Sequence, residues 1–125
     1  MKAGKYSGLL LFYTGVLHIL TGLYLGKDIF AGMIGEGLIA TVDGQYDREF
    51  AFWFLICGIL LLLFGSTLHH YIKQTRKPAP AFLGWQLLVF SLAGCAVVPF
   101  SGFWLFIPQA VIILLADRRK AHSDQ

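Results

Sequence analysis

Four long apolar blocks are the feature that most limits what this chain can fold into. A helix needs about 20 apolar residues to cross a hydrocarbon core about 30 Å thick. The blocks cover residues 7–26, 50–68, 81–98 and 102–116, and none of them contains Asp, Glu, Lys or Arg. The last two blocks are separated by only three residues, so we expect them to form a helical hairpin. The sequence therefore predicts an all-α fold, a transmembrane four-helix bundle that forms one domain over residues 1–125.

Charge and composition agree with a membrane location. Only 14% of the 125 residues are charged, whereas about a quarter are charged in a typical soluble domain. Eight of the ten lysines and arginines fall in segments on one side of the predicted bundle, and only Lys27 and Arg48 fall on the other. Positive residues favour the cytoplasmic side, so we expect cytoplasmic termini and a multi-pass protein of the plasma membrane. The net charge of +3 follows from this distribution, and we predict no nucleic-acid partner.

The only long connection, residues 27–49, lies on the predicted outer side. Asp28 is a candidate cap for a short helix. The apolar positions that follow it have helical spacing: Phe30, Met33, Ile34, Leu38 and Thr41. We expect a short amphipathic outer helix, and the sequence leaves open whether it lies on lipid or covers the bundle.

Small residues form a stripe on each predicted span, and such stripes let membrane helices pack closely. On the first span the stripe contains Gly8, Gly15 and Gly22, and on the second it contains Gly58 and Gly65. Four such faces predict a compact antiparallel bundle whose polar side chains point inward.

His18 falls on the stripe of the first span, near the middle of an uncharged run. An ionisable residue inside a span is costly and is a candidate functional residue by default. Two interpretations remain open. The imidazole either bridges two helices through hydrogen bonds, with Gln109 or a threonine as partner, or it contacts a ligand or handles a proton.

Residues from all four spans are expected to meet in the outer half of the bundle. This arrangement predicts a pocket for a small lipophilic molecule, which the protein would bind or carry. His18 and Gln109 would orient the molecule, and Trp53 and Trp104 would wall the pocket. Glu49 would lie at the mouth and favour a cationic or hydroxyl-bearing ligand.

Two other functions fit the same residues. A membrane-embedded isomerase or lyase would use His18 as its acid and base, but it needs a second proton-transfer group, and only Glu49 or Glu36 is available. A structural or accessory subunit would instead pack one glycine face against another membrane protein or a second copy of the chain. We expect no metal and no cofactor, since His69 and His70 lie near the opposite membrane face without Cys, Asp or Glu nearby.

Several stretches resemble those of a family of small bacterial membrane proteins with four spans. They are GVLHILTG, AFWFLICGILLLLFG, FLGW and PFSGFWLFIPQA, and the similarity runs from Tyr6 to Ala116. Its most specific marks are His18, the run from Phe52 to Phe54 with Gly58, and the stretch from Pro99 to Trp104. The resemblance implies a four-helix protein of the bacterial inner membrane. It implies no activity, because this family is a domain of unknown function.

Overall fold

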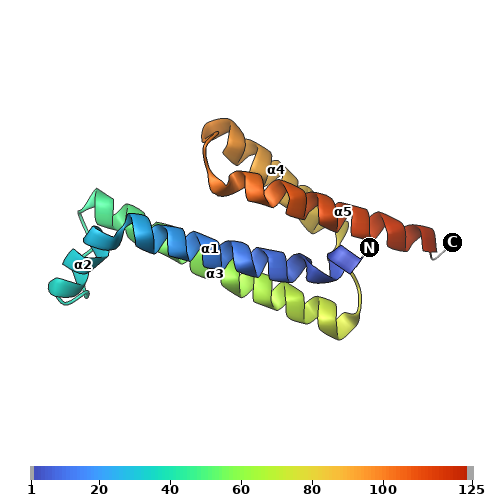
Figure 1. Ribbon diagram of the computed structural model, residues 1–125, viewed down its shortest axis with the longest axis horizontal. Coiled ribbons are helices and arrows are strands. Elements are labelled where there is room, and N and C mark those ends of the chain that lie inside the picture. Colours follow the sequence, from blue (N-terminus) through green and yellow to red (C-terminus); the bar gives the residue numbers. More distant parts are fainter. Residues whose placement is uncertain (1, 124–125) are drawn as a thin grey trace.

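The computed structural model describes residues 2–123, and all regular secondary structure in that range is helical (Figure 1). The all-α prediction is therefore confirmed for these residues. The elements are the 3-10 helix η1 (Lys2–Tyr6), α1 (Ser7–Leu25), α2 (Lys27–Gly35), α3 (Tyr46–Thr75), α4 (Ala81–Val97), the 3-10 helix η2 (Gly102–Leu105) and α5 (Phe106–Ser123).

The helix bounds follow the apolar blocks at α1 and α4 and depart from them at α3 and α5. α3 continues past Leu68 to Thr75, because no glycine or proline interrupts residues 69–75. The last block begins with η2, and α5 starts at Phe106. Pro108 thus lies in the first turn of α5, where its missing N–H would have no partner within the helix.

The outer amphipathic helix is shorter than its apolar spacing predicted. α2 ends at Gly35, and a left-handed Gly37 (φ 98°) terminates it. The N–H of Leu38 donates to the carbonyl of Met33, and that of Gly37 donates to Ile34. These two bonds form a Schellman motif, which closes a helix end around a glycine. Leu38 and Thr41 therefore lie beyond α2, and only the first part of the predicted stripe is helical.

Arg48 fastens this connection to the first turn of α3. Its guanidinium donates to both carboxylate oxygens of Glu36, at 2.7 and 2.6 Å, and to the carbonyl of Thr41 at 2.9 Å. The hydrogen bonds from Arg48, helped by its charge, hold the pKa of Glu36 below the ordinary value of 4.5. The ionised carboxylate therefore contributes to the order of residues 36–45.

We expect this connection to loosen in acid. In the released loop Glu36 has its ordinary pKa, whereas in the folded connection its pKa is lowered. The Glu36–Arg48 pair therefore stabilises the folded connection fully above the ordinary pKa, and this stabilisation is lost as the pH falls through the lowered pKa. Hydrogen exchange of residues 36–45, corrected for the intrinsic pH dependence, should accelerate below pH 4.5. Glu36→Gln should show the faster exchange already at neutral pH. Equal protection of wild type and variant at neutral pH would contradict the prediction.

α1 and α3 form the first helix pair, and glycines bring their backbones into direct contact. A Cβ on Gly65 would lie 2.7 Å from the Cα of Phe12, and one on Gly8 would lie 2.6 Å from the Cα of His69. A Cβ on Gly15 would lie 2.8 Å from the backbone nitrogen of Leu62. The glycine stripes that the sequence places on the first two blocks therefore face each other.

α4 and α5 form the second helix pair, and the two pairs meet near the chain termini. Gly4 of η1 contacts Ala116 of α5, and Thr14 of α1 is hydrogen-bonded to Gln109 of α5. Toward α2 the pairs diverge (Figure 1). The prediction of one compact four-helix bundle is therefore not confirmed, because close packing is concentrated within each pair.

Two helical segments are long and apolar enough to cross a membrane: Gly4–Leu25 and Tyr46–Thr75. In the most apolar 18-residue stretch of each segment, only 17% and 22% of the residues, respectively, are buried inside the molecule. A core helix of a soluble domain is mostly buried, so these segments present unusually large apolar surfaces. α4 is equally apolar but shorter, at 17 residues.

Candidate functional site

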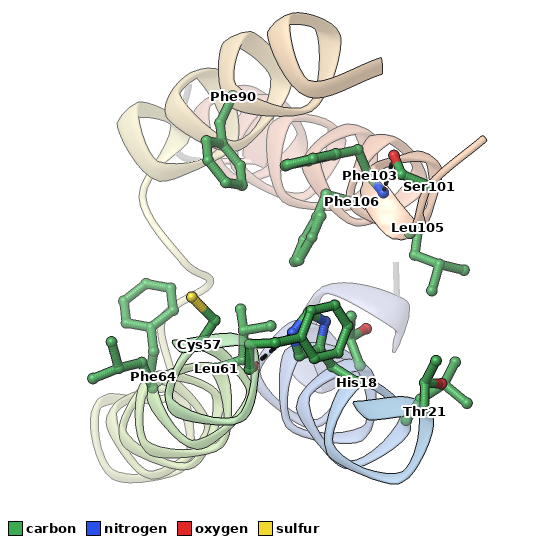
Figure 2. A pocket seen from close by; sticks show the side chains of 15 residues that line it. His18, Thr21, Cys57, Leu61, Phe64, Phe90, Ser101, Phe103, Leu105 and Phe106 are labelled. Carbon is green, nitrogen blue, oxygen red and sulfur yellow. Dashed lines mark hydrogen bonds between the residues drawn. The ribbon is translucent and has the colours of Figure 1, made fainter. Parts of the chain in front are cut away.

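A cavity of about 570 Å³ lies between the two helix pairs, on the side where they diverge (Figure 2). α1 and α3 form one wall, and the other is formed by Phe90 together with residues 101–103, 105 and 106. Most of the lining is aliphatic or aromatic: Leu17, Phe54, Leu60, Leu61, Phe64, Phe90, Phe103, Leu105 and Phe106. The remaining lining residues are Thr14, His18, Thr21, Cys57, Ser101 and Gly102.

The aromatic wall is held in place by its own contacts. The ring of Phe90 meets those of Phe103 and Phe106 edge to face, with centroids 5.2 and 6.0 Å apart. Edge-to-face contacts are favourable for aromatic rings. Phe103 also packs against Gly94, where the absence of a side chain leaves room for the ring. This wall of the cavity is therefore set by packing between α4, η2 and α5.

Few polar groups face the cavity, and most of them are already hydrogen-bonded. The hydroxyl of Thr14 donates to the carbonyl of Leu10 at 2.8 Å, and that of Ser101 donates to Val98 at 2.7 Å. None of the lining residues is Asp, Glu, Lys or Arg. His18 is therefore the strongest polar group that the cavity offers.

His18 is held on α3 by two contacts with one residue. Its Nε2 lies 3.0 Å from the carbonyl oxygen of Phe54, and its ring stacks on the Phe54 ring with centroids 3.9 Å apart. A carbonyl only accepts, so Nε2 carries the proton, and in the neutral ring Nδ1 keeps a lone pair. Gly58 makes this approach possible, since a Cβ there would lie 3.1 Å from the Cδ2 of His18.

Gln109 ties the two helix pairs together and is not part of the cavity lining. It is only 5% exposed, and its Nε2 donates to the hydroxyl oxygen of Thr14 at 2.6 Å. The single hydroxyl proton of Thr14 goes to Leu10, so the Gln109 amide must be the donor here. The Oε1 of Gln109 is buried and has no hydrogen-bond partner among the described residues.

Removing the Thr14 hydroxyl should cost more stability than removing the Gln109 amide. Thr14→Val leaves a second buried atom of Gln109 unpaired, whereas Gln109→Met removes the unpaired oxygen together with the bond. A buried group left unsatisfied costs about 1–3 kcal/mol. We expect Thr14→Val to lower the free energy of unfolding in detergent by about 1 kcal/mol more than Gln109→Met. Equal losses would contradict the prediction, because they would mean that the amide nitrogen left unpaired in Thr14→Val carries no penalty.

Three other residues predicted to form the pocket lie outside its lining. Trp53 is largely exposed and meets only Phe52 among aromatic neighbours. Trp104 is also exposed, and its indole N–H donates to the carbonyl of Pro99 at 2.7 Å, which fixes the turn before η2. Glu49 accepts from the N–H of Gly44 at 3.2 Å and so supports the turn before α3.

The sequence reasoning overlooked most of the phenylalanines that line the cavity. Phe54, Phe90, Phe103 and Phe106 come from four different elements, so no spacing along the chain groups them. The sequence offered little indication of their role, because each lies inside or beside an apolar block. An aromatic residue in such a block can equally well lie in a core or face lipid as line a cavity. Within residues 2–123, no group of three or more His, Cys, Asp or Glu side chains could hold a metal ion.

One comparison with known proteins gave a match. Residues 2–120 match a family described as "Family of unknown function (DUF6463)". This finding confirms the resemblance to an uncharacterised family. No curated protein and no solved structure matches the chain.

Proposed function

The chain belongs to this family of unknown function, DUF6463, and we propose that it is a membrane protein that binds or carries a small lipophilic molecule. In this proposal α1, α3, α4 and α5 each cross the bacterial plasma membrane, with both termini in the cytoplasm. The exposed apolar surfaces of Gly4–Leu25 and Tyr46–Thr75 support this. The concentration of lysine and arginine near the termini and the 76–80 connection supports the orientation.

The observation that carries the proposal is the cavity between the helix pairs. Its volume of about 570 Å³ lies within the range of about 300–1,000 Å³ that is typical of small-molecule sites. Such sites are mostly apolar with a few placed polar groups. The phenylalanine wall and His18 have this character, and in the proposed topology they lie in the outer half of the membrane.

His18 would orient the bound molecule. Its Nε2 is engaged by the carbonyl of Phe54, so Nδ1 is the ring atom left to accept a hydrogen bond. We therefore propose a ligand that carries a hydrogen-bond donor, such as a hydroxyl group, on an apolar body. In this arrangement the hydroxyl meets His18 and the apolar body lies against the phenylalanines.

Catalysis at this site is the less favoured alternative. An isomerase or lyase needs a second group to receive or supply the proton that His18 transfers. Neither Glu49 nor Glu36 lines the cavity; Glu49 accepts from Gly44, and Glu36 is bound by Arg48. We therefore assign His18 the task of orienting a ligand.

Native mass spectrometry of gently extracted protein tests the proposal. Leu60→Trp places a large side chain in the cavity, whereas Leu63→Trp alters the same helix outside it. Both leucines are 58% exposed, so the second variant is a matched control. We expect wild type and Leu63→Trp to retain a small molecule that Leu60→Trp lacks.

The same measurement separates the alternatives. A molecule retained equally by all three proteins would place the ligand elsewhere and overturn the cavity assignment. A wild-type protein that carries no molecule but binds a second polypeptide, and loses it in Leu60→Trp, would favour the structural or accessory subunit.

A further inference from the structure

A second cavity, of about 360 Å³, lies near the chain termini and shares no lining residue with the first. Its lining residues are Lys5, Tyr6, His69, Ile72, Lys73 and Arg76. Three of the six are lysine or arginine and none is acidic. This composition contrasts with the apolar lining of the first cavity and points to a different kind of ligand.

Two elements that are distant in sequence build this cavity. Lys5 and Tyr6 come from η1, His69, Ile72 and Lys73 come from the last turns of α3, and Arg76 is the C-cap of α3. Positions 69, 72 and 73 follow the spacing i, i+3 and i+4, which places them on one helix face, and Arg76 follows directly after the last helical residue. The close contact between Gly8 and the backbone of His69 brings η1 beside this face. The cavity thus depends on the extension of α3 beyond its apolar block.

The cations of this cavity have no counter-charge within the described part of the chain. No described carboxylate lies within 4.0 Å of Lys5, Lys73 or Arg76, since the Glu36–Arg48 contact is the ion pair that the structure records. Like charges around one cavity repel each other, and an anion between them removes this repulsion. His69 adds a buried Nδ1 that no described group pairs with.

Arg76 adds a second, independent observation. It ends α3 in the left-handed conformation, with φ 56° and ψ 17°. Glycine is the residue that adopts this conformation without strain at a helix end. The unpaired carbonyls at the C-terminal end of α3 favour nearby cations, which accounts for Lys73 and Arg76. They do not account for Lys5, which lies on another element. They also do not account for an arginine at a position where glycine would adopt the left-handed conformation more easily. Residues held in sparsely populated backbone conformations cluster at functional sites.

We propose that this cavity binds a phosphate-bearing anion. The guanidinium of Arg76 suits two phosphate oxygens at once, and the ammonium groups of Lys5 and Lys73 add charge around them. In the topology proposed above the cavity lies at the cytoplasmic surface, where an anionic lipid headgroup is the nearest source of such a group. The chemistry of the site itself does not depend on that topology or on the first cavity.

The test compares bound lipids in nanodiscs of phosphatidylcholine alone and of phosphatidylcholine with phosphatidylglycerol. Native mass spectrometry counts the lipids that each protein retains, and a parallel series adds inorganic phosphate to the phosphatidylcholine nanodiscs and records the melting temperature. The variants are Arg76→Gly and Lys5→Gln. Lys77→Gln is the control, since it removes one exposed cation beside Arg76 without touching the cavity.

We expect wild type and Lys77→Gln to retain phosphatidylglycerol in preference to phosphatidylcholine. Arg76→Gly and Lys5→Gln should reduce this preference about tenfold, as expected for the loss of one hydrogen bond between charged groups. Arg76→Gly should also melt at a higher temperature than wild type in phosphatidylcholine, because glycine relieves the left-handed backbone. If Arg76→Gly has a weaker preference for phosphatidylglycerol and yet is more stable than wild type, the weaker binding cannot be due to unfolding.

The lipid-binding series and the inorganic-phosphate series also distinguish a lipid headgroup from free phosphate as the ligand. Stabilisation of wild type by inorganic phosphate, without a lipid preference and lost in Arg76→Gly, would support the site with free phosphate as its ligand. Equal effects of Lys77→Gln and Arg76→Gly would show general surface attraction and overturn the proposal. So would the absence of both a lipid preference and a phosphate effect. None of these outcomes depends on what occupies the first cavity.

Discussion

Gly65→Ala is expected to separate α1 from α3 and to destabilise the protein by about 1–3 kcal/mol, the usual cost of an extra methyl group in a packed interior. The added Cβ would lie 2.7 Å from the Cα of Phe12 and 2.9 Å from the carbonyl oxygen of Gly8. Both atoms belong to backbone, so no change of side-chain rotamer relieves the overlap. Unfolding in mixed detergent micelles measures the loss.

The matched control is Gly35→Ala, at the end of α2. A Cβ at Gly35 meets nothing within 4 Å, and alanine favours a helix over glycine by about 1 kcal/mol. We expect Gly35→Ala to leave stability unchanged or slightly raised. Since the same chemical change is made at both sites, opposite signs would isolate the close contact between helices. A Gly65→Ala protein as stable as wild type would show that α1 and α3 do not pack as described.

His18→Phe is expected to remove the preference of the cavity for ligands that carry a hydroxyl group. Phenylalanine can keep the stacking on Phe54 but offers no ring nitrogen. 1-Naphthol and naphthalene are suitable probes, since they differ only in the hydroxyl group. In wild type we expect 1-naphthol to bind about tenfold more tightly, as expected for one hydrogen bond of about 1.4 kcal/mol. In His18→Phe the two should bind alike.

Titration in nanodiscs, corrected for partitioning into empty nanodiscs, measures both affinities. His18→Gln is the companion variant, because an amide keeps hydrogen-bonding capacity and loses the stacked ring. It should retain part of the preference for 1-naphthol. If His18→Phe still prefers 1-naphthol as strongly as wild type does, His18 does not contact the ligand, and its bond to Phe54 is a purely structural link between helices.

The helices themselves could be predicted from the sequence, and so could the glycine stripes on α1 and α3. Long uncharged blocks dictate helices in an apolar environment, since each backbone group finds its partner within the same segment. The spacing of seven between Gly8, Gly15 and Gly22 repeats between Gly58 and Gly65, which marks two faces suited to close approach. Local chemistry was sufficient for these features because they depend on residues near one another in the chain.

The site could be predicted only in part. His18 was found because an ionisable residue in a span is conspicuous, and it does line the cavity. Gln109 was correctly expected to be buried, but it bonds to Thr14 and lies outside the cavity lining. Trp53, Trp104 and Glu49 were assigned to the site by depth alone. Depth does not specify direction, and these side chains point to the exposed surface of the molecule or to turns.

The sequence by itself determined that the chain is helical, where its apolar segments lie, and that His18 is exceptional among them. Only the tertiary structure decided that the helices associate as two pairs that diverge, because this depends on how glycine faces on different segments select one another. The same pairing placed five phenylalanines around one cavity and brought Lys5 beside the end of α3. Contacts between segments far apart in the chain are set by the shapes of packed surfaces, and no local pattern encodes them.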